Sequence, residues 1–289
     1  MHPLRVIRMR SLQGPFADDK FVEAAMDTHR KSEVSDKIDD RCVALWKIER
    51  IGFSYCRHGS GTLHGPSVPV EILPISHTGL GIAAVEEAGL SPEKIRQSID
   101  SRAHPDFRHF AYESVGCAWG VYENRSFRRL FETFTGVRFP SCDLPSSGEF
   151  MAGFPARFRP LLSHGYGRTL YFVHRTLAGS IRAAAATSLD TSAAVQGIAF
   201  AYTMINFADL RRVLDVRPDL QQPTLAESFD NGLVLALAMW SWTFPGFLRH
   251  LSPQSDRQAE LIDRAEQVVS EGRSSGYFTP PGLSLAGRG

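Results

Sequence analysis

Residues 191–208 read TSAAVQGIAFAYTMINFA and residues 231–248 read NGLVLALAMWSWTFPGFL, and these two uncharged stretches decide the fold. Each approaches the roughly 20 apolar residues that cross a bilayer. The first stretch, however, contains Gln196 and Asn206, and Pro245 interrupts the second. We therefore expect two buried helices of a mainly α protein and no integral membrane segment.

Helix signals also mark most of the remaining chain. Ser91, Pro92 and Glu93 supply an N-cap oxygen, a proline suited to the first helical position and an early carboxylate. From 252 to 272, apolar residues recur at three- and four-residue spacing, which is typical of one face of an amphipathic helix. Clear period-two alternation is scarce, and Arg168–Val173 is the best strand candidate. The other helices are expected at 18–49, 77–89, 106–133, 175–187, 192–214 and 224–243.

Two stretches rich in helix-breaking residues divide this pattern. Residues 57–74 carry three glycines and three prolines, and residues 136–167 are rich in glycine, proline and serine. Such stretches usually form surface loops, where binding residues often lie. We expect one globular helical domain over 1–272, followed by a flexible tail over 273–289.

A faint internal repeat relates the two halves of this domain. When the chain is shifted by 116 residues, Tyr55–His58 falls on Tyr171–His174, and Gly81–Ala83 falls on Gly197–Ala199. A true repeat predicts two similar helical halves around a central pocket. A chance likeness within one helical core is the alternative. The repeated halves would cover 50–135 and 166–251.

Length and charge exclude several classes of protein. The chain has 289 residues, a formal net charge of +1 and 43% hydrophobic residues. A chain of this size buries roughly 75% of its unfolded surface, which is enough for a large core. Because a nucleic-acid binder concentrates positive charge, the near-zero balance argues against a nucleic-acid partner.

The cysteines and the N-terminal segment bear on the compartment. Cysteines occur at 42, 56, 117 and 142, too far apart in sequence for a zinc knuckle or a dithiol redox motif. A reduced, cytoplasmic protein is the simpler interpretation. Residues 1–12 are basic but lack the apolar stretch of a signal peptide.

The standard cofactor motifs are missing from the sequence. It contains no Gly-rich phosphate loop with its lysine, no dinucleotide fingerprint and no His-Glu-x-x-His motif. We therefore predict no cofactor. The ten histidines leave a metal ion as an alternative.

The densest group of ionisable side chains is His109, Tyr112 and Glu113, followed by Gly116 and Gly120. On a helix these residues share one face, because neighbours there lie three and four positions apart. An imidazole, a phenol and a carboxylate beside glycines could line a pocket and transfer protons. In the alternative interpretation, the glycines only let helices pack closely and Glu113 pairs with an arginine.

Four more residues are candidates for substrate binding. Asp230 lies at the place in the second half that matches the Glu113 region, and Arg168 could bind an anion with its fork of donors. His58 and His174 occupy matched positions in the repeat, each three residues after a tyrosine. Core packing, a turn-stabilising arginine and ordinary core or surface histidines are the alternatives.

Several of these segments resemble a known family. Gly81–Ala83 and His109–Trp119 are similar to the histidine-aromatic-Val-Gly-x-Gly-Trp region of the family called domain of unknown function 1702, which includes enediyne-biosynthesis accessory proteins. Gly165–Val173 resembles that family's Gly-x-Gly-Arg-Ser-Leu-Trp-Phe-Val, and Gly197–Tyr202 its Gly-x-Gly-Leu-Ala-x-Ala-Tyr. The likeness spans roughly 50–245. It implies bacterial specialised metabolism and a hydrophobic polyketide- or polyene-like substrate.

Together, these features predict an enzyme that isomerises or cyclises a hydrophobic polyketide- or isoprenoid-like molecule by acid/base chemistry. Glu113, His109 and Tyr112 would donate or accept the protons. Burial would raise the pKa of Glu113 and suit it to act as an acid.

Aromatic residues would shape the cavity and stabilise a developing cation. The candidates are Trp119, Phe110 and Tyr202. Two other functions use the same fold: a binding or carrier protein for a hydrophobic intermediate, and a scaffold partner of a synthase. A homo-oligomer or a synthase is the expected protein partner.

Overall fold

Helices make up most of the chain in the computed structural model, and the residues that it describes form no strand. The mainly α class expected from the sequence is thus confirmed. The chain divides into two compact units, residues 1–111 with 121–144 and residues 112–120 with 145–289. The described residues are 26–27, 29–31, 38–58, 62–63, 68–135, 137–139, 146–187, 189–206, 209–220 and 222–275.

The first unit is built around the packing of α3 on α4. A Cβ placed on Gly52 would lie 1.8 Å from the carbonyl oxygen of Ser76, and one on Gly79 would lie 1.8 Å from that of Glu49. The two main chains are therefore in direct contact. The helices of this unit are α3 (Ile38–His58), η1 (Val70–Ile72), α4 (Leu73–Ala88), α5 (Pro92–Arg102) and α7 (Arg125–Thr135).

Capping residues in the first unit begin and end its helices. The Oγ of Ser91 accepts a hydrogen bond from the main-chain N–H of Lys94, and Pro92 begins α5. Helix α4 ends at Gly89, which adopts the left-handed conformation with φ of 59°.

Helix α6 (Arg108–Glu123) belongs to both units, because Tyr112–Gly120 fall in the second. The predicted single helix over 106–133 is wrong, since α6 ends before Asn124 and α7 starts after it. The Oδ1 of Asn124 accepts the N–H of Phe127 at 2.9 Å, so this side chain caps a new helix.

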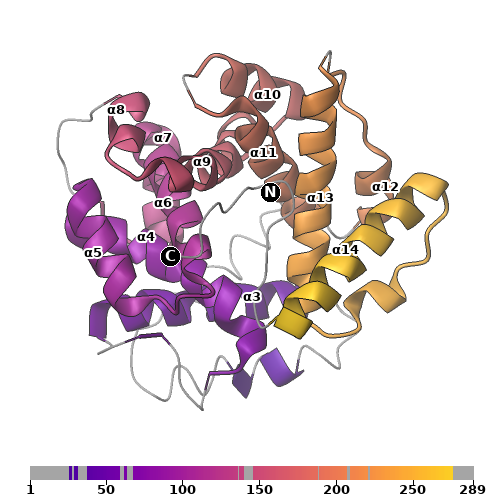
Figure 1. Cartoon of the computed structure of the whole chain (residues 1–289), viewed down its shortest axis with the longest axis horizontal. Coiled ribbons are helices and arrows are strands. Elements are labelled where there is room, and N and C mark those ends of the chain that lie inside the picture. The colour runs from indigo at the N-terminus through magenta and orange to yellow at the C-terminus, as the bar shows by residue number, and fades with distance from the viewer. Residues whose placement is uncertain are drawn as a thin grey trace. The chain divides into compact units, whose positions relative to one another are not determined.

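The second unit centres on α11, which packs on both α9 and α13. Helix α14 lies alongside α13 (Figure 1). The two uncharged stretches fall largely within α11 and α13, and most of their residues are buried. The helices are α8 (Ser147–Ala152), η2 (Ala156–Phe158), α9 (Arg159–His174), α10 (Leu177–Ala185), α11 (Thr191–Asn206), α12 (Leu210–Asp215), α13 (Pro223–Thr243), η4 (Phe247–His250) and α14 (Asp256–Ser275).

Helix α9 corrects two sequence predictions at once. The expected loop over 136–167 contains α8, η2 and the first half of α9, and the expected strand over 168–173 is the second half of α9. Glycines usually break helices, which is why the sequence predicts a loop here, but Gly165 and Gly167 lie inside the helix against carbonyl oxygens of its neighbours. Close packing outweighs the helix propensity that each glycine lacks.

Other helix boundaries differ by shorter stretches. The helix expected over 192–214 is divided into α11 and α12, where the Oδ1 of Asp209 accepts the N–H of Arg212 and caps α12. Helix α14 continues to Ser275, three residues into the expected tail, whose remainder lies outside the described residues. None of the helices in the described ranges has the length and hydropathy needed to cross a membrane.

Candidate functional site

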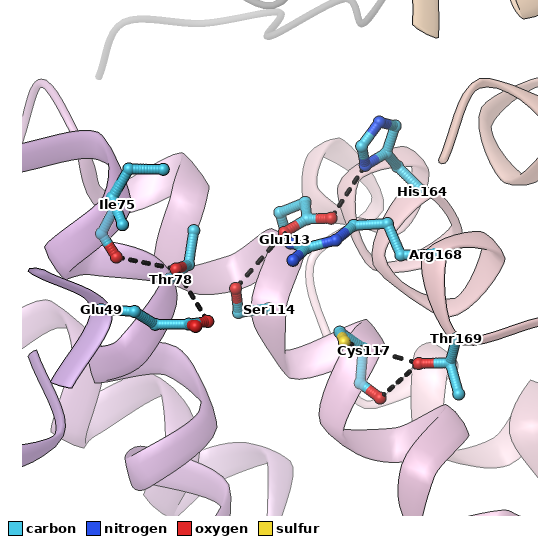
Figure 2. Close-up of polar contacts among 9 residues, drawn as sticks. All are labelled: Glu49, Ile75, Thr78, Glu113, Ser114, Cys117, His164, Arg168 and Thr169. Atoms are coloured by element: carbon cyan, nitrogen blue, oxygen red, sulfur yellow. Dashed lines mark hydrogen bonds and ion pairs between the residues drawn. The ribbon is translucent and has the colours of Figure 1, made fainter. Parts of the chain in front are cut away.

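In the second unit, the carboxylate of Glu113 on α6 meets two side chains of α9 (Figure 2). The Nδ1 of His164 lies 2.9 Å from Oε1, and the Nη1 of Arg168 lies 2.6 Å from Oε2. The Oγ of Ser114 also donates to Oε2, at 3.3 Å. The side chains of His164, Glu113 and Arg168 are only 2%, 7% and 16% exposed. A carboxylate, an imidazole and a guanidinium therefore meet inside the protein.

The helices position these groups through close main-chain contact. His164 and Arg168 are one turn apart on α9, so both reach the same neighbour. A Cβ on Gly165 would lie 1.8 Å from the carbonyl oxygen of Glu113, and one on Gly116 would clash as severely with the main chain of α9. The absence of these Cβ atoms brings the glutamate within hydrogen-bond reach.

The charge of Glu113 differs from the sequence prediction. Burial raises the pKa of this carboxyl, as expected, but the charge of Arg168 and the hydrogen bond from His164 outweigh burial, and the pKa lies below its ordinary value. Glu113 is a carboxylate at neutral pH. The prediction that its pKa is raised, which suited it to donate a proton, is wrong.

The ionised carboxylate also determines the tautomer of His164. Because Glu113 accepts the hydrogen bond, the Nδ1 of His164 carries a hydrogen, and in the neutral ring Nε2 holds the lone pair. That Nε2 is buried, and no residue in the described ranges forms a hydrogen bond with it. The ring of Phe200 on α11 lies edge-on with its centroid 5.7 Å away. The imidazole ring therefore has an apolar neighbour on α11.

Anion binding is one of the two interpretations of Arg168 given above, and Glu113 is an anion in contact with it. Its guanidinium carbon lies 5.2 Å from the centroid of Phe200, within the range of a cation–π contact. The same phenylalanine thus contacts both His164 and Arg168. Arg168 neutralises the buried carboxylate.

Aromatic candidates on α6 lie in packed ring clusters of the second unit. Tyr112 stacks on Phe158 with centroids 3.8 Å apart and planes 12° apart. Trp119 stacks on Phe150 with centroids 4.3 Å apart. Both rings are fully buried, which gives them a clear packing role.

His109 and Phe110 lie on the part of α6 that belongs to the first unit. Both are buried, and their ring centroids are 4.1 Å apart. The side chains that contact the carboxylate of Glu113 are instead those of His164, Arg168 and Ser114.

Two further candidates contact protein groups of their own unit. The ring of Tyr202 is half-buried and lies edge-on to Tyr171, with centroids 5.7 Å apart. Asp230 accepts hydrogen bonds from both Nη atoms of Arg257, at 2.8 and 2.5 Å. This bidentate pair joins α13 to α14.

Of the two repeat histidines, the side chain of one is described. His174 is the last residue of α9 and is exposed. His58 is the last residue of α3, and its side chain lies outside the described residues.

Sequence reasoning missed His164 as a functional candidate. It falls near the end of the expected loop over 136–167, and its four-residue spacing from Arg168 carries a signal only on a helix. The glycines beside it concealed that helix.

Within the described part of the chain, no group of three or more His, Cys, Asp or Glu side chains could hold a metal ion. A comparison with family models, curated proteins and solved structures found no match.

Proposed function

We propose that this protein is an enzyme that moves a proton on a hydrophobic small molecule, with His164 as the base. One observation carries the proposal: Nδ1 of His164 is held by an ionised carboxylate, while its buried Nε2 has no hydrogen-bond partner in the described chain. A buried polar atom that lacks a partner costs roughly 1–3 kcal/mol, so such an atom needs an explanation.

A second buried histidine illustrates the difference. His77, in the first unit, donates from Nδ1 to the carbonyl oxygen of Leu73 at 2.7 Å. Its Nε2 accepts the main-chain N–H of His104 at 2.8 Å. Both nitrogens serve the fold there. The unfilled Nε2 of His164 favours a partner that comes from outside the chain.

The neighbours of His164 have complementary roles in this proposal. Glu113 holds the imidazole in one tautomer and stabilises the imidazolium that forms when Nε2 takes a proton. Arg168 neutralises the carboxylate and keeps it ionised, so the proton stays on the imidazole. Glu113 orients the base and is not the acid.

The proposed reaction is the isomerisation or cyclisation of a polyketide- or isoprenoid-like substrate. In the simplest case, Nε2 takes a proton from the carbon between a carbonyl and a C=C bond, and the C–H electron pair moves into the conjugated system. The imidazolium then returns the proton to the far carbon, so that no oxidant or cofactor is consumed. The apolar ring of Phe200 beside the base supports a hydrophobic substrate.

The proposed setting is bacterial specialised metabolism in the cytoplasm. The motif resemblance supports this pathway class. Cys56 is a buried thiol that forms no disulfide in the described part of the chain, as is usual in a reducing compartment.

The test is deuterium uptake from D₂O, measured by mass spectrometry. The probes are N-acetylcysteamine thioesters of long-chain β,γ-unsaturated acids. His164→Asn is the decisive variant, because the asparagine amide can still donate to Glu113 but has no atom at the place of Nε2. We expect it to lower the exchange rate by about 10²- to 10⁴-fold.

The matched control is His250→Asn, which changes an exposed histidine of the same unit and should leave the rate unchanged. Equal exchange by His164→Asn and the wild type would refute the assignment of the base. If the wild type binds the probes without exchange, it is a carrier. If it binds none of them but co-elutes with a synthase, it is a scaffold.

A further inference from the structure

Within the described ranges, three helix crossings share one register. In each crossing, both helices carry a glycine that faces a carbonyl oxygen of the other helix. On each helix, the residue that supplies the oxygen comes three positions before the glycine. A Cβ on any of these six glycines would lie 1.8 to 2.0 Å from the facing oxygen. The pairs are Gly52–Ser76 and Gly79–Glu49 in α3/α4, Gly116–Leu162 and Gly165–Glu113 in α6/α9, and Gly167–Ala194 and Gly197–His164 in α9/α11.

Two of the oxygens at these crossings belong to the residues of the candidate site. Gly165 contacts the carbonyl oxygen of Glu113, and Gly197 contacts that of His164. The residues whose side chains share a 2.9 Å hydrogen bond are thus also held by main-chain contact. His164, whose buried Nε2 has no hydrogen-bond partner among the described residues, lies where α9 contacts both α6 and α11.

We propose that Gly165 and Gly197 are positioning residues of this site. Gly165 holds the main chain of Glu113 against α9, and Gly197 holds α11 against the main chain of His164, through contacts that involve no side-chain rotamers. That these glycines support catalysis rests on the proposed function. That they position the two residues does not. Side-chain repacking elsewhere in the core would leave the separation unchanged, whereas one added methyl group would alter it.

A methyl group at residue 165 must displace the main chain of α6. Real Cβ atoms essentially never approach another heavy atom within 3.0 Å, so a contact of 1.8 Å requires a shift of about 1 Å. A hydrogen bond of 2.9 Å weakens steeply when it lengthens by that amount. The Nδ1–H of His164 would then lose the contact that specifies its tautomer.

The first unit supplies a matched control. Gly79→Ala introduces the same 1.8 Å clash, with the carbonyl oxygen of Glu49, in a crossing of the same register. Its cost in packing should equal that of Gly165→Ala. Because α3 and α4 lie in the other unit, this variant tests loss of helix packing without touching the site.

The experiment is NMR of protein labelled with ¹⁵N-histidine, with the His164 signals assigned by their loss in His164→Asn. The wild type should show a slowly exchanging, downfield proton on Nδ1. Gly165→Ala should lose that proton or shift the ring to the Nε2–H tautomer, and Gly197→Ala should shift the His164 ring signals because α11 carries Phe200 against this ring. Gly79→Ala should retain the wild-type signals despite a similar fall in melting temperature.

A milder variant covers the case in which Gly165→Ala does not fold. A Cβ on Gly120 meets the side chain of Thr169, at 2.8 Å, instead of a carbonyl oxygen, so Gly120→Ala separates the same two helices by less. It should weaken the Nδ1–H signal in part.

Wild-type His164 signals in a folded Gly165→Ala or Gly120→Ala protein would overturn the proposal, as would an equal loss in Gly79→Ala. The readout does not depend on turnover. If the NMR result holds while His164→Asn leaves deuterium uptake unchanged, the positioning role stands and the proposed function fails.

Discussion

The Nδ1–H of His164 points at Oε1 of Glu113 from 2.9 Å, while Nε2 of the same ring has no partner among the residues that the structure places. Arg168 holds the second carboxylate oxygen at 2.6 Å. The charges of this carboxylate and of the guanidinium cancel. Such a buried pair contributes little net stability when intact, but breaking it leaves an uncompensated charge in the interior.

Glu113→Gln and Arg168→Met should each lower the free energy of unfolding by about 3 kcal/mol, because each leaves one buried charge unpaired. The double variant should lose clearly less than the two losses together. Urea denaturation of the four proteins gives this coupling energy. Strictly additive losses would show that the ion pair is not formed.

The same cycle should depend on pH. The folded-state pKa of Glu113 lies below its ordinary value of 4.5, so its carboxylate stabilises the fold above that pH, and this stability is lost as pH falls through the folded pKa. The stability difference between the wild type and Glu113→Gln should therefore shrink in acid. A difference that stays constant down to the lowest pH at which the protein folds would contradict the lowered pKa.

His77 should contribute a separate acid sensitivity. Burial lowers the pKa of His77 from 6.5 to about 4. A proton on Nε2 would also break the hydrogen bond that this atom accepts from the N–H of His104. The unfolded chain takes up this proton at higher pH than the folded one, so stability falls as pH drops from 6.5 toward 4.

The loss at His77 is at most about 3 kcal/mol. Urea denaturation across that pH range, with His77→Asn beside the wild type, measures it. The variant should have the flatter pH dependence, and His250→Asn should follow the wild type. Equal slopes for the wild type and His77→Asn would rule out the buried neutral ring.

The thiol of Cys56 should react slowly in the folded protein. Burial raises the pKa of Cys56 to about 11. At pH 8 the thiolate is then on the order of 100-fold scarcer than at an ordinary cysteine. Ellman's reagent can measure this in a variant whose other cysteines are serine. A reaction as fast as that of the urea-unfolded chain would contradict the burial.

Asp230 should act through stability and not through substrate binding. Asp230→Asn weakens the bidentate pair with Arg257 and should cost about 1–2 kcal/mol of unfolding free energy. Well below the melting temperature, Asp230→Asn and the wild type should take up deuterium at the same rate when the probe is saturating. A specific rise in the KM for the probes, with stability intact, would restore the substrate role that the sequence suggested.

Local sequence signals predicted most of the helices because they act over a few residues. Ser91 and Pro92 begin α5, and the apolar runs become the buried helices α11 and α13. The same reasoning failed at α9. Whether Gly165 and Gly167 break a helix or permit close packing depends on the carbonyl oxygens of α6 and α11, which local sequence cannot reveal.

The sequence predicted one part of the candidate site, the region of Glu113, and missed the other, His164. The Glu113 region was singled out by its dense ionisable groups, and one of the two alternatives, glycine packing with an arginine pair, matches the contacts of Gly116 and Arg168. Tyr112 and Trp119 were equally conspicuous, yet their rings stack within the core. Residue type alone does not distinguish a buried packing ring from one that meets a ligand.

The sequence by itself determines a mainly helical protein, since helix periodicity, caps and apolar runs are properties of neighbouring residues. It also places the region around Glu113 on a helix. The identity of the residues that meet there, and the charge of Glu113, depend on His164 and Arg168, which lie 51 and 55 positions away along the chain. Only folding brings these groups within 3 Å of one another, and at that distance the electrostatic interaction outweighs the effect of burial.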